Sequence, residues 1–147
     1  MVYRLYVETA KKGSKTAWAF TFYNHQDFLV YKRSGTCELQ EENAVVLDIS
    51  ATALEYFERS MRRRYYDEHF STRIDEDYVT LYTSVLDIVN TASAIKENNQ
   101  NMYSFCSNDN AWSRLIPFFQ QKTMSFEIAT DKKFINFAKE LAKEKLK

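Results

Sequence analysis

The sequence has 147 residues, of which 45% are hydrophobic and 16% aromatic, so it can bury the core of one folded domain and is not a disordered chain. Its formal net charge is zero, whereas strong nucleic-acid binders usually carry a basic excess. No apolar run approaches the roughly 18 residues of a membrane-spanning helix, and the start lacks the apolar core of a signal peptide. We therefore expect a single cytoplasmic domain over residues 1–147, without membrane contact.

The first part of the chain favours three β-strands, at residues 3–9, 17–23 and 27–32. Each segment is rich in the aromatic and β-branched residues that suit a pleated, half-buried surface. The linkers between them are short, which favours an antiparallel three-stranded meander. Gly35 is expected to end the third strand.

Helical periodicity begins after this meander. A helix is predicted at residues 41–64 because apolar residues recur at helical spacing between Val45 and Phe57. Residues 65–77 are polar and show no clear period, so we expect an insertion or an irregular loop. A fourth strand is predicted at residues 78–83.

The last part of the chain alternates helices with one strand. Helices are predicted at residues 84–95 and 110–121, and Pro117 can kink the second of them. A fifth strand follows at residues 124–129, and Asp131 is expected to cap a final amphipathic helix. The predicted order is therefore β-β-β-α-β-α-α-β-α.

Short motifs accompany this order of elements. They are Glu8-Thr9-Ala10 before Gly13-Ser14, Ala53-Leu54-Glu55 in the first helix, Thr83-Ser84 after the fourth strand, Ala111-Trp112-Ser113-Arg114-Leu115, Met124-Ser125-Phe126-Glu127-Ile128, and Lys139-Glu140-Leu141-Ala142 in the last helix. The motifs and their order resemble a type 1 ribonuclease H-like domain over essentially the whole chain. That resemblance implies an α/β fold with a mixed five-stranded sheet, three antiparallel strands and then two parallel ones, and helices on both faces.

Ribonuclease H enzymes hydrolyse phosphodiesters with two divalent metals held by four acids. The resemblance places Glu8, Val46, Ser84 and Lys139 at those four positions. Only Glu8 is acidic, a valine cannot ligate a metal, a serine hydroxyl is a weak neutral ligand, and a lysine cation repels a divalent ion. The family's histidine loop before the last helix also has no counterpart, because residues 130–133 join strand to helix directly. We therefore expect an inactive domain that needs no metal or small-molecule cofactor.

Two hypotheses concern what remains of this site. In the first, Glu42 and Asp87, each one helical turn from a family position, join Glu8 as displaced acids. The protein is then a divergent Mg²⁺- or Mn²⁺-dependent endonuclease that cleaves RNA in RNA–DNA hybrids. In the second, Lys139 replaces the metal by approaching Glu8 within about 4 Å, and Ser84 bonds to the pair. The alternative for Lys139 is simple extension to solvent.

Three groups of residues are candidate contact surfaces. They are Arg62, Arg63 and Arg64 with Tyr65, the basic cluster Lys11, Lys12 and Lys15, and Asn43 at a family position that contacts the hybrid. Arg and Tyr are favoured at interface hot spots, although each group is also typical of a solvated surface. Glu42 beside Asn43 would repel phosphate, which argues against binding of the hybrid. Because the formal net charge is zero, we slightly favour a protein partner over nucleic acid.

Overall fold

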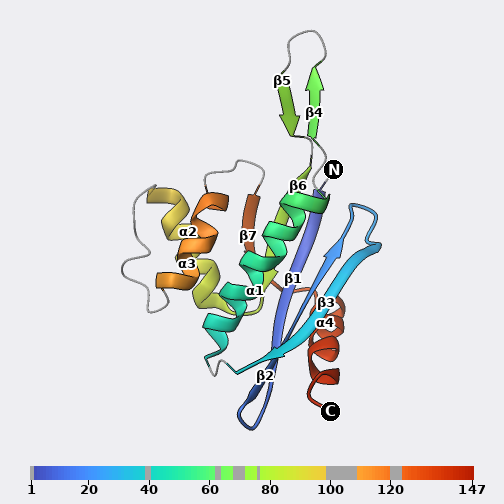
Figure 1. Ribbon diagram of the computed structural model, residues 1–147, viewed down its shortest axis with the longest axis vertical. Helices are drawn as coiled ribbons and strands as arrows, with labels where there is room; N and C mark the ends of the chain where they lie inside the picture. The colour runs from blue at the N-terminus through green and yellow to red at the C-terminus, as the bar shows by residue number, and fades with distance from the viewer. Residues whose placement is uncertain are drawn as a thin grey trace.

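The computed structural model describes residues 2–38, 41–61, 64–67, 72–75, 77–98, 109–119 and 124–147, and of these 64–67, 72–75, 95–98, 109–111 and 119 by their backbone alone. A five-stranded sheet runs through the centre, with helices on both faces and a two-stranded hairpin beyond one end (Figure 1). The sheet strands are β1 (Val2–Lys12), β2 (Lys15–Tyr23), β3 (Leu29–Cys37), β6 (Tyr78–Thr83) and β7 (Met124–Ile128), and the hairpin strands are β4 (Arg64–Asp67) and β5 (Thr72–Asp75). The helices are α1 (Glu42–Tyr56), continued by the π-helical turn η1 (Phe57–Met61), α2 (Leu86–Asn98), α3 (Asp109–Phe119) and α4 (Lys132–Glu144).

The strand order in the sheet is β3-β2-β1-β6-β7. The first three strands pair antiparallel, whereas β6 and β7 add in parallel beside β1. The turn between β1 and β2 is tight because Gly13 adopts a φ of 60°, which L-residues rarely accept. The predicted mixed sheet of three antiparallel and two parallel strands is therefore confirmed.

Strand β1 is buried on both faces because it lies in the middle of the sheet. Leu5 and Val7 point into the main core, which α1, α2 and α3 cover. Tyr6 points to the other face, where it contacts Phe134 of α4. Since side chains alternate along a strand, Glu8 lies on the α4 side together with Tyr6.

Helix α4 packs by a small-residue stripe. Ala138 and Ala142 are fully buried and let the helix approach the alanines of β2 closely. The helix begins where the side chain of Asp131 accepts a hydrogen bond from the Lys133 backbone N–H, at 3.2 Å. The predicted cap at Asp131 is therefore confirmed.

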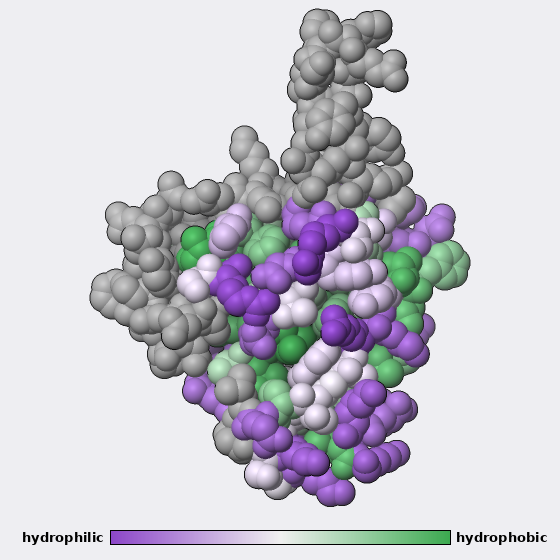
Figure 2. Space-filling view, in the orientation of Figure 1, coloured by the Kyte–Doolittle hydropathy of each residue, from purple (hydrophilic) through white to green (hydrophobic). Residues whose placement is uncertain are grey.

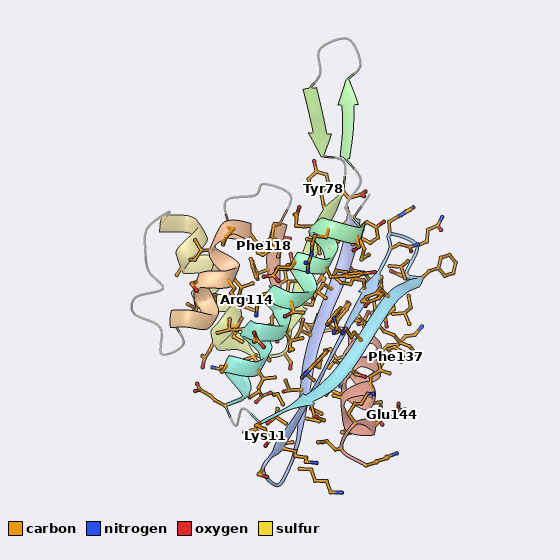
Figure 3. All side chains as sticks on the ribbon, in the orientation of Figure 1. Lys11, Tyr78, Arg114, Phe118, Phe137 and Glu144 are labelled. Carbon is orange, nitrogen blue, oxygen red and sulfur yellow. The ribbon has the colours of Figure 1, made fainter. Side chains whose placement is uncertain are left out.

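Arg114 connects α3 to the outward side of α1, which hydrophilic residues largely cover (Figure 2). Its guanidinium bonds to the Asp48 carboxylate, to both Glu55 carboxylate oxygens at 3.2 Å and to the Thr52 hydroxyl at 3.2 Å. Figure 3 shows Arg114 beside α1. Asp48 thus serves the contact between two helices and lies away from the sheet.

The prediction that Gly35 ends the third strand is wrong. Strand β3 runs from Leu29 to Cys37, and Gly35 pairs with Trp18 of β2. A Cβ at Gly35 would lie 2.6 Å from Cζ2 of Trp18, so the missing side chain makes room for the indole. The glycine marks a close contact inside the strand and not the end of the strand.

The prediction for residues 41–64 and 65–77 is also corrected. Helix α1 ends at Tyr56 and η1 at Met61, so the first helix is shorter than expected. Within the stretch expected to be an insertion or irregular loop, β4 and β5 form an antiparallel hairpin. Each strand has only four residues, which is too short for an alternating pattern to be recognised.

None of the helices in the described part of the chain is long and apolar enough to cross a membrane.

Candidate functional site

The carboxyl ends of β1 and β6 meet at one place in the sheet. These neighbouring strands are parallel, and their register pairs Tyr6 with Tyr82. The same register brings Glu8, two residues further on β1, opposite Ser84, which directly follows β6. The Ser84 hydroxyl donates a hydrogen bond to Oε2 of Glu8 at 2.8 Å. Two of the four positions predicted from the sequence are thus in direct contact.

The carboxyl group of Glu8 is almost completely buried. Its side chain is 2% exposed, and burial raises its pKa above the ordinary value for glutamate. The Ser84 hydrogen bond and the positive charge of Lys139 oppose this rise, whereas the like charge of Glu42 adds to it. Its second oxygen, Oε1, is buried and has no hydrogen-bond partner. An unpaired buried oxygen favours the protonated form of Glu8.

Val46 does not face this carboxyl group. It is fully buried in the main core, with Leu5 and Val7 of β1 and the apolar residues of α1. Because side chains alternate along a strand, Glu8 points to the other face of β1 from Leu5 and Val7 and is not part of this core cluster. The position at which the sequence resemblance predicted an acid therefore lies in the hydrophobic core.

Lys139 lies near Glu8 without forming an ion pair with it. Both residues are described, and the ion pairs within 4.0 Å in the described part of the chain do not join them. The expected contact within about 4 Å is therefore not formed. The reason is the rotation of α4 about its axis. The buried Ala138 faces the sheet, so Lys139, the next residue along the helix, points about 100° away from that direction. Lys139 is half-buried and acts on Glu8 by longer-range attraction, which lowers its pKa.

The two candidate displaced acids are placed differently. Glu42, in the first turn of α1, accepts a hydrogen bond from the Thr9 hydroxyl at 2.9 Å and is close enough to raise the pKa of Glu8. Asp87 is exposed in the first turn of α2, a helix that packs towards β7. Among the described residues, no three His, Cys, Asp or Glu side chains come together as metal ligands. The expected cluster of Glu8, Glu42 and Asp87 is therefore not formed.

A two-metal centre does not fit this donor set. Two divalent ions require several hard oxygen ligands around them. The site offers the unpartnered Oε1 of Glu8, together with Glu42, which Thr9 already engages. The positive charge of Lys139 acts on the same carboxyl group and opposes a divalent ion. Sequence reasoning missed the part played by Thr9, because a threonine beside an acid on a strand carries no distinctive pattern.

The predicted contact surfaces are only partly described. Arg62 and Arg63 lie outside the described residues, and Arg64 and Tyr65 belong to β4, of which only the backbone is described. The cluster of Lys11, Lys12 and Lys15 is exposed at the turn between β1 and β2, where Figure 3 marks Lys11. Asn43 is half-buried in the first turn of α1. A binding role for these residues stays a prediction.

The sequence matches no family model, and no curated protein matches it closely. Solved structures do match. Ribonuclease H1 from the halophilic archaeon Halobacterium salinarum NRC-1 superposes with a TM-score of 0.66 at 15% identity, over 99% of this chain and 98% of that one. The chain has the ribonuclease H fold.

Two further structural neighbours were solved with nucleic acid. LC11-RNase H1 in complex with RNA/DNA hybrid matches with a TM-score of 0.63 at 12% identity, over 97% of this chain and 94% of that one. A foamy viral protease-reverse transcriptase in complex with dsDNA matches with a TM-score of 0.69 at 8% identity, over 98% of this chain and 92% of that one. At these identities the likeness to ribonuclease H structures concerns the fold alone.

Proposed function

We propose that this protein is a catalytically inactive ribonuclease H-like domain that acts by binding a macromolecular partner, a protein in preference to a nucleic acid. The observation that carries the proposal is the replacement of three of the four acid positions. Val46 is core, Ser84 is a hydrogen-bond donor to Glu8, and Lys139 brings a cation beside it. Phosphodiester hydrolysis by this fold depends on the charge that these positions no longer provide.

The remaining contacts support a structural role for the former site. The Glu8–Ser84 hydrogen bond joins β1 to the end of β6, and the positive charge of Lys139 on α4 lowers the pKa of the same carboxyl group. The site is thereby an internal polar link between two neighbouring strands of the sheet. A domain with such a link keeps its fold and can use other surfaces for binding.

A protein partner is favoured by the balance of charge. The chain has as many acidic as basic residues, and its formal net charge is zero. Glu42 lies at the start of α1, beside the position of Asn43, where a phosphate backbone would meet like charge. Two of the structural neighbours were solved as complexes with nucleic acid, which supports a test of this class of partner as well.

A second candidate function is a divergent nuclease that uses Glu8 with Glu42. The proximity of these two acids favours it, because the charge of Glu42 raises the pKa of Glu8. The free Oε1 of Glu8 is the one ligand atom that such a site would offer at once. Against it stands the cation of Lys139, which no rearrangement of the two acids removes.

Hydrolysis of labelled RNA–DNA hybrid and of single-stranded RNA, with Mg²⁺ or Mn²⁺, tests the proposal. The wild type should cleave neither substrate faster than Glu8→Ala does. Glu140→Gln, which removes an exposed acid of α4 that pairs with Lys143, is the matched control. Cleavage that is lost in Glu8→Ala and kept in Glu140→Gln would establish the nuclease instead.

A further inference from the structure

An apolar groove lies near the N-terminal end of α4, between this helix and the start of β3. It has a volume of about 530 Å³ and is lined mainly by aromatic and aliphatic side chains. Phe28, Leu29 and Phe137 form much of its wall, and they are 63%, 40% and 38% exposed. Hydrophobic surface is visible at this end of the β2–β3 hairpin (Figure 2), and Phe137 is marked beside β3 in Figure 3. Contiguous exposed apolar surface of this kind marks an interaction site.

The groove adjoins an open edge of the sheet. Strand β3 is the outermost strand and pairs only with β2 among the described strands. An unpaired edge presents backbone N–H and C=O groups that an extended peptide can complete as a further strand. A peptide added along β3 would place every second side chain on the α4 side, where the groove lies.

The charges around the groove select the partner. Its two acids are already paired within the protein, Asp27 with Arg4 and Glu140 with Lys143. The cations Lys32 and Lys133 have no carboxylate within 4.0 Å in the described part of the chain. They lie instead over aromatic rings, Lys32 over Phe137 and Lys133 over Phe134, each at 5.9 Å from the centroid. The unmatched charge at the rim is therefore positive.

A second copy of the chain does not fit this edge. Antiparallel pairing of two β3 strands about their middle would set Lys32 and Arg33 of each copy against those of the other. Both residues are exposed and basic, and like charges directly opposite in a sheet are destabilising. An acidic segment of another protein has the complementary charge.

We propose that the groove between β3 and α4 binds an extended peptide segment of another protein that pairs with the β3 edge. The segment places one large apolar side chain in the groove and a carboxylate two residues later beside Lys32. This inference rests on the proposed binding function and names its surface and the chemistry of its partner. The Glu8–Ser84 contact takes no part in it, so the two proposals can fail separately.

The test uses a fluorescein-labelled peptide, Ser-Thr-Phe-Thr-Glu-Thr-Glu-Ser, and a counterpart with lysine in place of both glutamates. Fluorescence anisotropy should show binding of the acidic peptide that is at least about tenfold tighter than that of its counterpart. Phe28→Ser and Lys32→Glu should each weaken binding by about fivefold or more. Tyr78→Ser, at an aromatic residue 45% exposed on the start of β6, is the control and should bind as the wild type does. Hydrogen exchange should show new protection along β3.

Several results would overturn the inference. They are equal binding of the two peptides, no binding of the acidic peptide at millimolar concentration, and binding that Phe28→Ser leaves unchanged. A dimer in sedimentation that Phe28→Ser dissociates would assign the groove to a second copy, and displacement of the peptide by RNA–DNA hybrid would assign it to nucleic acid. Hybrid cleavage that depends on Glu8 would refute the inactive domain while leaving peptide binding measurable.

Discussion

Introducing an acid at position 46 provides a sharp test of whether this position can contribute to a metal site. Val46 is fully buried in the hydrophobic core and does not face the carboxyl end of β1. In Val46→Glu, the new side chain would sit where the sequence resemblance to ribonuclease H places an acid. Since water does not reach this position, the variant should unfold more easily and gain no activity.

The magnitude follows from burial. A glutamate that must stay neutral at pH 7, with an unfolded pKa near 4.3, costs about 3.7 kcal/mol. Loss of the buried valine adds about 1 to 2 kcal/mol, part of its transfer free energy. The free energy of unfolding should therefore fall by about 5 kcal/mol, a large part of the stability of an ordinary domain.

Urea denaturation followed by circular dichroism gives this difference. Because the folded-state pKa of the introduced glutamate is raised, its cost is present at neutral pH and disappears as the pH falls below the unfolded pKa. Val30→Glu makes the same substitution at a valine that is 45% exposed, and should change stability by at most about 1 kcal/mol. A Val46→Glu variant within about 1 kcal/mol of the wild type at pH 7 would refute the burial of this position.

Three other substitutions test separate contacts. Burial raises the pKa of Glu8, so the free energy of unfolding of the wild type should fall relative to that of Glu8→Gln as the pH rises above about 4. Urea titrations at several pH values measure this, and a difference in unfolding free energy that does not change with pH would contradict it. Gly35→Ala should lower the unfolding free energy by about 1 to 3 kcal/mol and shift the fluorescence of Trp18, and a double-mutant cycle with Trp18→Val should show coupling between the two sites. Arg114→Met should lower the free energy of unfolding by about 1 to 2 kcal/mol, and by less at high salt. Lys143 forms a 3.5 Å ion pair with an exposed acid, so Lys143→Met should lower it by under about 0.5 kcal/mol. Equal losses in the two variants would contradict a special role for Arg114.

Most of the sheet could be predicted because its strands have strong local signals. The runs around Tyr6 and Phe20 combine aromatic and β-branched residues, and tight turns connect them. Asp131 was identified as a cap because a carboxylate before an amphipathic run has one usual role. The end of the third strand was predicted wrongly at Gly35, because a glycine at a close contact and a glycine at the end of a strand look alike in sequence.

The candidate site was predicted in its chemistry but only partly in its geometry. The pairing of Glu8 with Ser84 follows from the register of β1 and β6, which a family resemblance can transfer. The distance from Lys139 to Glu8 depends on the rotation of α4, which is set by how Ala138 packs on the sheet. The groove at Phe28 depends on the turn before β3 and on a helix more than a hundred residues later, so no local pattern could indicate it.

The central claim is that the carboxyl ends of β1 and β6 do not form a two-metal centre. Titration of Mn²⁺, followed through the electron paramagnetic resonance signal of the free ion, measures this directly in the wild type and in Glu8→Gln. The account predicts that both proteins leave Mn²⁺ free up to millimolar concentration. Saturable binding of two Mn²⁺ ions by the wild type, lost in Glu8→Gln, would contradict it.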